Sequence, residues 1–291
     1  MNIIETIDQM NNEKYSYQQE GKSVGFVPTM GYLHEGHLKL IEESNKNNDI
    51  TVVSIFVNPK QFNQQSDLDG YPRDITRDQE LLKQYDVDYI FYPDSKEMYP
   101  TSLTIDLSLS SRGNVLCGKT RPGHFEGVLL VLSKLFHIVS PTHAYFGLKD
   151  AQQVAVVKAL VEDLNFNIQI IPVPTVREKD GLAKSSRNVN LEPLEREEAS
   201  HLIKALYVGR KCLIEHGLKR NEIIRSVNDY LNKHVTGQID YVDCLSYPTL
   251  SNEITENHAI IIAVAVKYKK ARLIDNFILN SNGDFIYKER N

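Results

Sequence analysis

Short apolar, β-branched runs alternate with longer stretches of helical periodicity between Val24 and about Val173. The apolar runs predict strands at Val24–Val27, Thr51–Val57, Asp88–Tyr92, Ala144–Phe146 and Asn167–Ile171. Apolar residues with helical spacing predict helices at His37–Ser44, Ile75–Gln84, Val128–Ile138 and Gln152–Leu164. This alternation is typical of βαβ units, so we expect an α/β fold with a parallel sheet and helices on both faces.

The pattern changes after Pro174. A polar loop runs to Arg187, and the charged run Glu192–Glu198 is expected to be a solvated helix start. The elements predicted beyond it are helices Leu194–His216 and Arg220–His234 and strands Tyr241–Ser246, Ala259–Lys267 and Arg272–Ile274. We therefore predict two domains, at residues 1–175 and 176–291, the second a smaller α+β unit.

Composition narrows the class of protein. A chain of 291 residues with 41% apolar and 24% charged residues is of the soluble globular class. Its net charge of −5 disfavours a nucleic-acid partner. The cysteines Cys117, Cys212 and Cys244 are odd in number and widely spaced, which favours reduced thiols in a cytoplasm. The apolar run Ala259–Val266 is too short to cross a bilayer, so we expect no membrane partner.

The segment from Pro28 to His37 is the strongest candidate for chemistry. It follows the first predicted strand and contains His34 and His37 in a His-x-Gly-His pattern. A strand that ends in a small-residue turn and feeds a helix presents backbone N–H groups to phosphates. Two imidazoles there can donate protons and stabilise charge on phosphorus. Half of a metal site and a pair of structural histidines remain alternatives for this motif.

Polar side chains follow two further predicted strands. Asn58 and Gln61 come after the second strand, where amides can hold a small polar acid, although a loop stiffened by proline is the alternative. Lys149 lies beside a predicted helix start that Asp150 caps, where its charge can meet a phosphate. Gln153 is expected on the first turn of that helix.

Two loops differ in how well they fit phosphate binding. Residues from Lys184 to Asn188 place two hydroxyls between two cations, which suits a clamp over a triphosphate, with a flexible linker as the alternative. Gly113–Thr120 fits the Walker A formula and follows the strand-like run Thr104–Leu109. We reject it as a P-loop, because Arg121–Gly127 places proline and two glycines where the helix must continue.

Taken together, six ordered blocks resemble the pantoate–β-alanine ligase family over nearly the whole chain. The blocks are Pro28–His37, Phe56–Phe62, Tyr71–Arg73, Arg121–Phe125, Phe146–Gln153 and Ser185–Asn188. The resemblance implies a Rossmann-like nucleotidylyltransferase domain, a C-terminal domain that acts as a lid, and a homodimer. It also implies the reaction: ATP and (R)-pantoate give pantoyl adenylate and pyrophosphate, and β-alanine then gives pantothenate and AMP.

The resemblance also assigns residues to roles. It implies catalytic roles for His34, His37, Lys149, Ser185, Ser186 and Arg187. ATP is expected to contact Met30, Gly31, Tyr32, Leu33, His34, Glu35, Gly36, His37, Gly147, Leu148, Lys149, Asp150, Val176, Lys184, Ser185, Ser186 and Arg187. Gln61, Gln153 and Asn58 are expected to bind pantoate or β-alanine. Mg²⁺ is expected to bridge the phosphates, with Asp78 as a candidate protein ligand.

Two other functions stay open at the level of sequence. A different nucleotidylyltransferase with the same histidine motif would join a nucleotide to a phosphate ester and keep that link in its product. A nucleotide-sensing module would bind ATP without turning it over. Release of AMP with formation of an amide separates the ligase from both.

Overall fold

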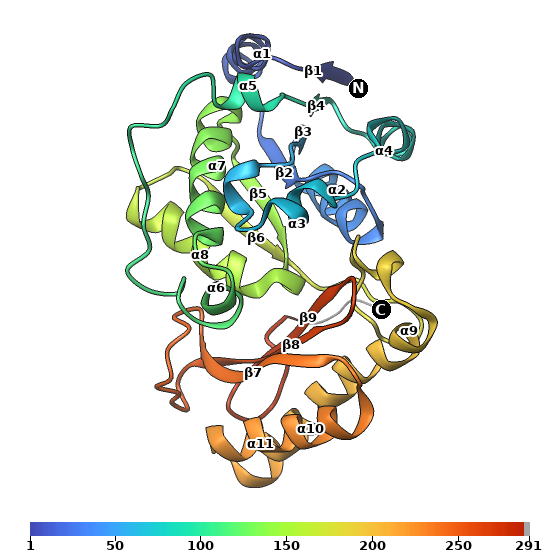
Figure 1. The fold of residues 1–291 in the computed structure, drawn as a ribbon. Helices are drawn as coiled ribbons and strands as arrows, with labels where there is room; N and C mark the ends of the chain where they lie inside the picture. Colours follow the sequence, from blue (N-terminus) through green and yellow to red (C-terminus); the bar gives the residue numbers. More distant parts are fainter. Residues whose placement is uncertain (288–291) are drawn as a thin grey trace. The chain divides into compact units, whose positions relative to one another are not determined.

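The computed structural model describes residues 1–287, which are divided between two compact units (Figure 1). The first unit contains residues 1–113, 121–147 and 156–173, and the second contains residues 114–120, 148–155 and the chain from Pro174 onward. The change of unit after Val173 lies next to the predicted boundary. Residues 114–120 and 148–155 group with the later unit, although the sequence pattern placed them in the first domain. The functions predicted for the two domains stay predictions.

The first unit is built on a parallel sheet, as predicted, and the sheet has six strands. The strands, in spatial order, are β1 (Asn2–Ile4), β4 (Tyr89–Phe91), β3 (Ile50–Ile55), β2 (Val24–Thr29), β5 (His143–Gly147) and β6 (Gln169–Val173). The strand order reverses between β2 and β5, which pair through Gly25 and Phe26. In such sheets, ligands bind outside the carboxyl ends of the strands at this switch point. Thr29 and Gly147 end these two strands.

Helices cover both faces of the sheet because successive side chains of β2 point to opposite sides. The principal helices of this part of the chain are α1 (Ile7–Gln19), α2 (Glu35–Asn47), α4 (Ile75–Leu82), α7 (His124–Val139) and α8 (Ala151–Asp163). Val27 packs in a cluster with Leu38 and Ile41 of α2. Its neighbour Phe26 meets Phe136 of α7 edge to face, with ring centroids 6.3 Å apart.

Several short elements and one long helix were not predicted. The short elements are strand β1, the α-helices α3 (Gln65–Asp69), α5 (Ser95–Met98) and α6 (Leu116–Thr120) and the 3₁₀ turns η1 (Pro59–Gln61), η2 (Leu148–Asp150) and η3 (Asn188–Asn190). Helix α1 buries Met10 and Tyr17 and is otherwise polar, so its apolar stripe is too sparse to detect. The strand-like run Thr104–Leu109 forms no strand, which supports the rejection of a Walker A loop.

The second unit is α+β, as expected. Its antiparallel sheet consists of β7 (Gln238–Tyr247), β8 (Ala259–Lys267) and β9 (Arg272–Leu279), and its longer helices are α9 (Pro193–Ala199), α10 (His201–His216) and α11 (Arg220–His234). The helix predicted from Leu194 to His216 is two helices that meet at Ser200. All three cysteines are buried free thiols. Within residues 1–287, no helix is both long and apolar enough to cross a membrane.

Candidate active site

His34 and His37 lie at the start of α2, directly after the loop that leaves β2. His34 is the N-cap residue, and its Nδ1 accepts a hydrogen bond from the backbone N–H of Gly36 at 3.1 Å. His37 reaches back, and its Nδ1 accepts from the backbone N–H of His34 at 3.3 Å. The two rings are 4.1 Å apart between centroids. Because both Nδ1 atoms accept, each neutral ring carries its proton on Nε2, which makes Nε2 the donor atom of each ring.

The structure gives a steric reason for glycine at position 36 that the sequence alone did not provide. A Cβ at this position would lie 2.8 Å from Cε1 and 3.0 Å from Nδ1 of His34. The structure shows that the absent side chain makes room for the His34 ring, which folds back over the first turn of α2. The glycine therefore fixes the position of one catalytic candidate.

The alternative of a metal site at the two histidines gains no support. Among residues 1–287, no group of three or more His, Cys, Asp or Glu side chains is arranged to hold a metal ion. The two Nδ1 atoms cap the helix instead. A structural capping role and a role in ligand binding are compatible here, because the cap uses Nδ1 of each ring and the donor atom is Nε2.

Asp78 does not fit its expected role as a Mg²⁺ ligand. Its carboxyl group is 1% exposed, and Oδ2 and Oδ1 accept hydrogen bonds from the backbone N–H groups of Tyr32 at 2.7 Å and Leu33 at 2.8 Å. Burial raises the pKa of this carboxyl, and the two N–H bonds oppose the rise. Both oxygens are thus turned towards the loop between β2 and α2, and the candidate ligand is an anchor of that loop.

Gln61 ends the 3₁₀ turn η1, and Asn58 fixes it there. Gln61 Nε2 is 2.8 Å from the sulfur of Met30, and its Oε1 accepts from Asn58 Nδ2 at 3.2 Å. Asn58 is 1% exposed, donates also to the oxygen of Gly127, and accepts from Lys60 N and Tyr99 OH. With each donor and acceptor of its amide in use, Asn58 is suited to support Gln61 and not to contact pantoate itself.

His124, from the block Arg121–Phe125, holds the turn that ends at Gln61. His124 Nδ1 lies 2.8 Å from the backbone oxygen of Gln61, and its Nε2 lies 3.1 Å from Arg121 Nη1. Gly127 adds to this support, because a Cβ there would be 2.2 Å from the oxygen of Lys60. The first turn of α7 therefore packs directly against the turn that presents Gln61.

The expected ATP residues after β5 lie in η2 and the first turn of α8. Asn276 donates from Nδ2 to the backbone oxygens of Leu148 at 2.9 Å and Lys149 at 3.0 Å, and Lys149 Nζ is 3.5 Å from Asp150 Oδ2. Gln153 is half-buried on the first turn of α8. Its neighbour Gln152 binds the backbone of Val115 and Cys117, so this glutamine is structural.

The expected triphosphate loop, residues 184–188, follows a short hairpin with an anchored base. Arg177 and Ala183 form a β-bridge, and Lys184 N donates to the oxygen of Val176 at 2.9 Å. Ser185 Oγ accepts from the backbone N–H of Arg187 at 3.3 Å, and Ser186 is buried.

Arg196 belongs to the charged run that was expected to be a solvated helix start, and it contacts this hairpin. It binds Asp180 at 2.5 Å and Glu178 at 2.6 Å, so the charged run Glu192–Glu198 is not simply solvated. The hydrogen bond from Arg196 lowers the pKa of the Asp180 carboxyl.

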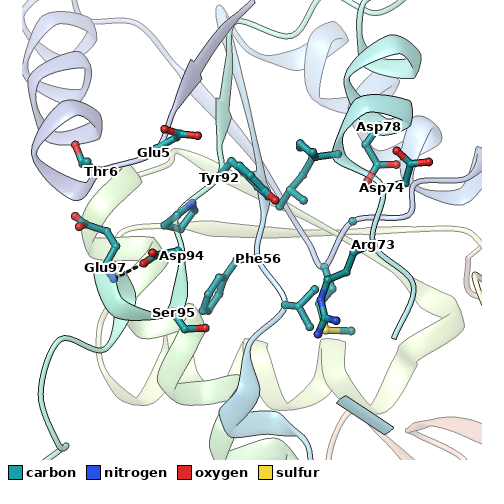
Figure 2. Close-up of a pocket in the computed structure, with 16 residues that line it drawn as sticks. Glu5, Thr6, Phe56, Arg73, Asp74, Asp78, Tyr92, Asp94, Ser95 and Glu97 are labelled. Atoms are coloured by element: carbon teal, nitrogen blue, oxygen red, sulfur yellow. Dashed lines mark hydrogen bonds between the residues drawn. The ribbon is translucent and has the colours of Figure 1, made fainter. Parts of the chain in front are cut away.

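A cavity of about 500 Å³ lies in the first unit beside the carboxyl ends of β3 and β4 (Figure 2). Met30 and Gly31 form part of its wall, so it adjoins the loop that leads to the histidines. Asp74 and Asp94 of its lining are helix N-caps, and Glu97 accepts from the backbone N–H of Ile7. These acidic side chains have structural partners. The cavity was not predicted from the sequence.

Comparisons with known proteins show the family of this chain. The family described as Pantoate-beta-alanine ligase matches residues 2–278. Pantothenate synthetase of Geobacillus thermodenitrificans is 52% identical over 279 residues, which cover 96% of each chain. Pantothenate synthetase of Bacillus cereus strain AH187 is 51% identical over 280 residues, which cover 96% of this chain and 99% of the relative.

Solved structures give the same result. Pantothenate synthetase from Thermus thermophilus superposes with a TM-score of 0.86 at 39% identity, covering 95% of this chain and 98% of that one. Pantoate-beta-alanine ligase from Francisella tularensis, complexed with beta-gamma ATP and beta-alanine, has a TM-score of 0.79 at 35% identity and covers 96% of this chain and 97% of that one. This chain belongs to the Pantoate-beta-alanine ligase family.

Proposed function

We infer that this protein condenses (R)-pantoate with β-alanine in an ATP-dependent reaction that yields pantothenate, AMP and pyrophosphate. The observation that carries this function is the pair of imidazoles at the switch point of the sheet, within a chain that matches the family over nearly its full length. Membership of the family disfavours the alternatives of a nucleotide sensor and of a nucleotidylyltransferase that stops at a nucleotide-linked product.

We propose that the first step is attack by a pantoate carboxylate oxygen on the α-phosphorus of ATP. A new P–O bond forms, the bond to the β-phosphate oxygen breaks, and pyrophosphate leaves with the electron pair. His34 and His37 donate from Nε2 to phosphate oxygens, with His37 as the proton donor. Their Nδ1 contacts support this role, because they fix both rings and place the proton of each on Nε2.

In the second step the neutral amine of β-alanine attacks the acyl carbon of pantoyl adenylate. An amide C–N bond forms, the bond to the AMP oxygen breaks, and the amine gives up a proton to solvent. We assign Gln61 and Gln153 to pantoate, and place Gln61 beside the β-alanine position. Gln61 is held by hydrogen bonds from Asn58 to its side chain and from His124 to its backbone oxygen. These contacts support the assignment, because an amide that orients a substrate must itself be held in place.

We assign the remaining phosphate contacts to Lys149, Ser185, Ser186 and Arg187, with Lys184 beside them. The support is the match of these motifs to the family and their cationic, hydroxyl-rich composition. Magnesium bound to ATP would supply charge neutralisation on the phosphates. Because Asp78 is turned towards backbone amides, we expect the ion to be held mainly by phosphate oxygens and water.

We further propose that the C-terminal domain shields the adenylate from water, and that the enzyme is a cytoplasmic homodimer. Family resemblance supports these proposals. Light scattering of the purified protein tests the dimer through its molar mass.

Exchange of labelled pyrophosphate into ATP tests the function. We expect exchange that depends on pantoate, followed by stoichiometric AMP and pantothenate when β-alanine is added. Omission of pantoate is the control. An exchange rate that does not depend on pantoate, or a stable nucleotide-linked product, would contradict the proposal.

A further inference from the structure

The loop between β2 and α2 has an unusual backbone. Gly31 has φ +81° and Tyr32 has φ +51°. Tyrosine carries a Cβ, so the left-handed conformation is unfavourable for it relative to ordinary backbone. The turn directs the neighbouring N–H groups of Tyr32 and Leu33 to one side, and successive N–H groups in a turn form a concave site for an anion. Something in the fold must stabilise this turn.

The anion in that concavity is the carboxylate of Asp78. It accepts from the N–H groups of Tyr32 and Leu33 at 2.7 and 2.8 Å, one on each oxygen. Figure 2 shows Asp78, which belongs to helix α4, and Asp74, the N-cap residue of that helix, at the edge of the cavity. The loop and α4 are far apart in sequence, so this contact forms only when the chain has folded.

Arg77 completes the anchor. Its guanidinium lies 4.7 Å from the ring centroid of Tyr32, and its Nη1 lies 3.3 Å from Asp78 Oδ1. The next side chain of the loop, Leu33, is fully buried in the core cluster with residues of α2 and β3. Backbone, ring and side chain of the loop are thus held at three points immediately before His34.

We propose that Asp78 is a positioning residue for adenylate formation, which sets His34 and His37 against the ATP phosphates by holding the Tyr32 and Leu33 amides. The inference rests on the phosphate-binding role proposed for the two histidines. Loss of the carboxylate leaves two N–H groups without their partner and frees a left-handed tyrosine to relax. His34, the N-cap residue of α2, comes immediately after Leu33 in the chain, and His37 is bonded to it. Relaxation of the loop therefore moves both rings.

Three variants separate positioning from general stability. Asp78→Ala removes both acceptors. Asp78→Asn keeps the size of the side chain and one acceptor. If the alanine variant does not fold, this variant distinguishes positioning from general stability. Asp74→Ala is the matched control, because Asp74 caps the same helix and lines the same cavity but accepts from Arg77 N and not from the loop.

We expect Asp78→Ala to slow pantoate-dependent pyrophosphate exchange on the order of 100-fold, because small displacements of aligned groups have effects of this size. Asp78→Asn should lose roughly 10-fold, and Asp74→Ala less than about 2-fold. The second half-reaction, started from supplied pantoyl adenylate, should keep its rate in all three variants. Equal losses in both half-reactions, or a loss in Asp74→Ala that matches Asp78→Ala, would overturn the proposal.

Two further readouts bear on the mechanism of the loss. The ring ¹⁵N resonances of His34 and His37 should shift in Asp78→Asn and stay unchanged in Asp74→Ala; unshifted resonances would contradict positioning. Recovery of the exchange rate at high Mg²⁺ would assign Asp78 to metal binding and overturn our proposal. His37→Ala is assayed alongside: full activity of that variant refutes the role of the histidines, whereas a pantoate-independent wild type refutes the function itself.

Discussion

The imidazole of His124 donates from Nδ1 to the backbone oxygen of Gln61 across 2.8 Å. A carbonyl oxygen accepts only, so the proton lies on Nδ1, and Nε2 accepts from Arg121. His124 is 8% exposed, so water does not readily replace either partner. Through this contact, the start of α7 determines where the amide of Gln61 points.

His124→Phe should therefore weaken pantoate binding. The variant keeps an aromatic ring but leaves the Gln61 oxygen without its donor, so the turn that presents the Gln61 amide is free to shift. We expect a rise of roughly 10- to 100-fold in KM for pantoate, the size of effect that a small displacement of a positioning group has. KM for ATP should change less than about 2-fold. The matched control is His137→Phe near the other end of α7, where steady-state kinetics should be unaltered. An unchanged KM for pantoate in His124→Phe would show that Gln61 is held by other contacts.

Gly36→Ala should disable adenylation while leaving the protein folded. The added methyl group would meet Cε1 of His34 at 2.8 Å and displace the ring, although alanine itself favours helix. We expect pyrophosphate exchange to fall at least about 10-fold with no loss in the thermal unfolding midpoint. Gly36→Ser should be at least as impaired. Wild-type exchange in both variants would mean that the position of the His34 ring does not matter.

His37→Ala should slow adenylate formation far more than it weakens pantoate binding. A positioned acid or charge donor contributes about 10²- to 10⁴-fold to a rate. We expect a loss of that size in single-turnover formation of pantoyl adenylate, with the Kd for pantoate from equilibrium dialysis within about 2-fold. His258→Ala, at an exposed histidine, is the control. Equal single-turnover rates for His37→Ala and the wild type would refute the assignment.

Arg177→Met should destabilise the second unit. Arg177 binds Asp275 through two contacts, of 2.7 and 3.1 Å, and these side chains are 10% and 2% exposed. Removal of the cation leaves a buried carboxylate without its partner, which costs about 3–5 kcal/mol in the free energy of unfolding. Urea denaturation measures the loss. The double variant Arg177→Met/Asp275→Asn should recover part of it, and a loss under about 1 kcal/mol in the single variant would contradict the expectation.

The regular elements were largely predictable because their patterns are local. Strand β8 has its predicted bounds, Ala259–Lys267, and α11 has its predicted bounds, Arg220–His234. β8 is a continuous apolar run, and α11 buries a stripe of apolar residues at helical spacing, Ile223, Val227 and Leu231. The edge strand β1 and the polar helix α1 were missed, since neither carries enough apolar residues to stand out. The break at Ser200 was missed because the apolar pattern continues through it.

The candidate site divides in the same way. The histidine motif and Gln61 were found from residue type and from their place after predicted strands. The supporting contacts of Asn58, His124 and Asp78 were not, because each depends on a partner that is distant in sequence. An amide, an imidazole or a carboxylate has the same appearance in sequence whether it faces a ligand or a backbone group.

The sequence by itself determined the parallel α/β fold, the α+β C-terminal part and the order of motifs that the family shares. These features follow from hydrophobic periodicity and from short turns, which act within a few neighbouring residues. Tertiary structure decided what each of these residues does: Asp78 anchors a loop, Asn58 holds the Gln61 amide by a hydrogen bond, and Gly36 leaves room for the His34 ring. Hydrogen bonds and steric contacts between segments far apart in the chain exist only once the chain has folded.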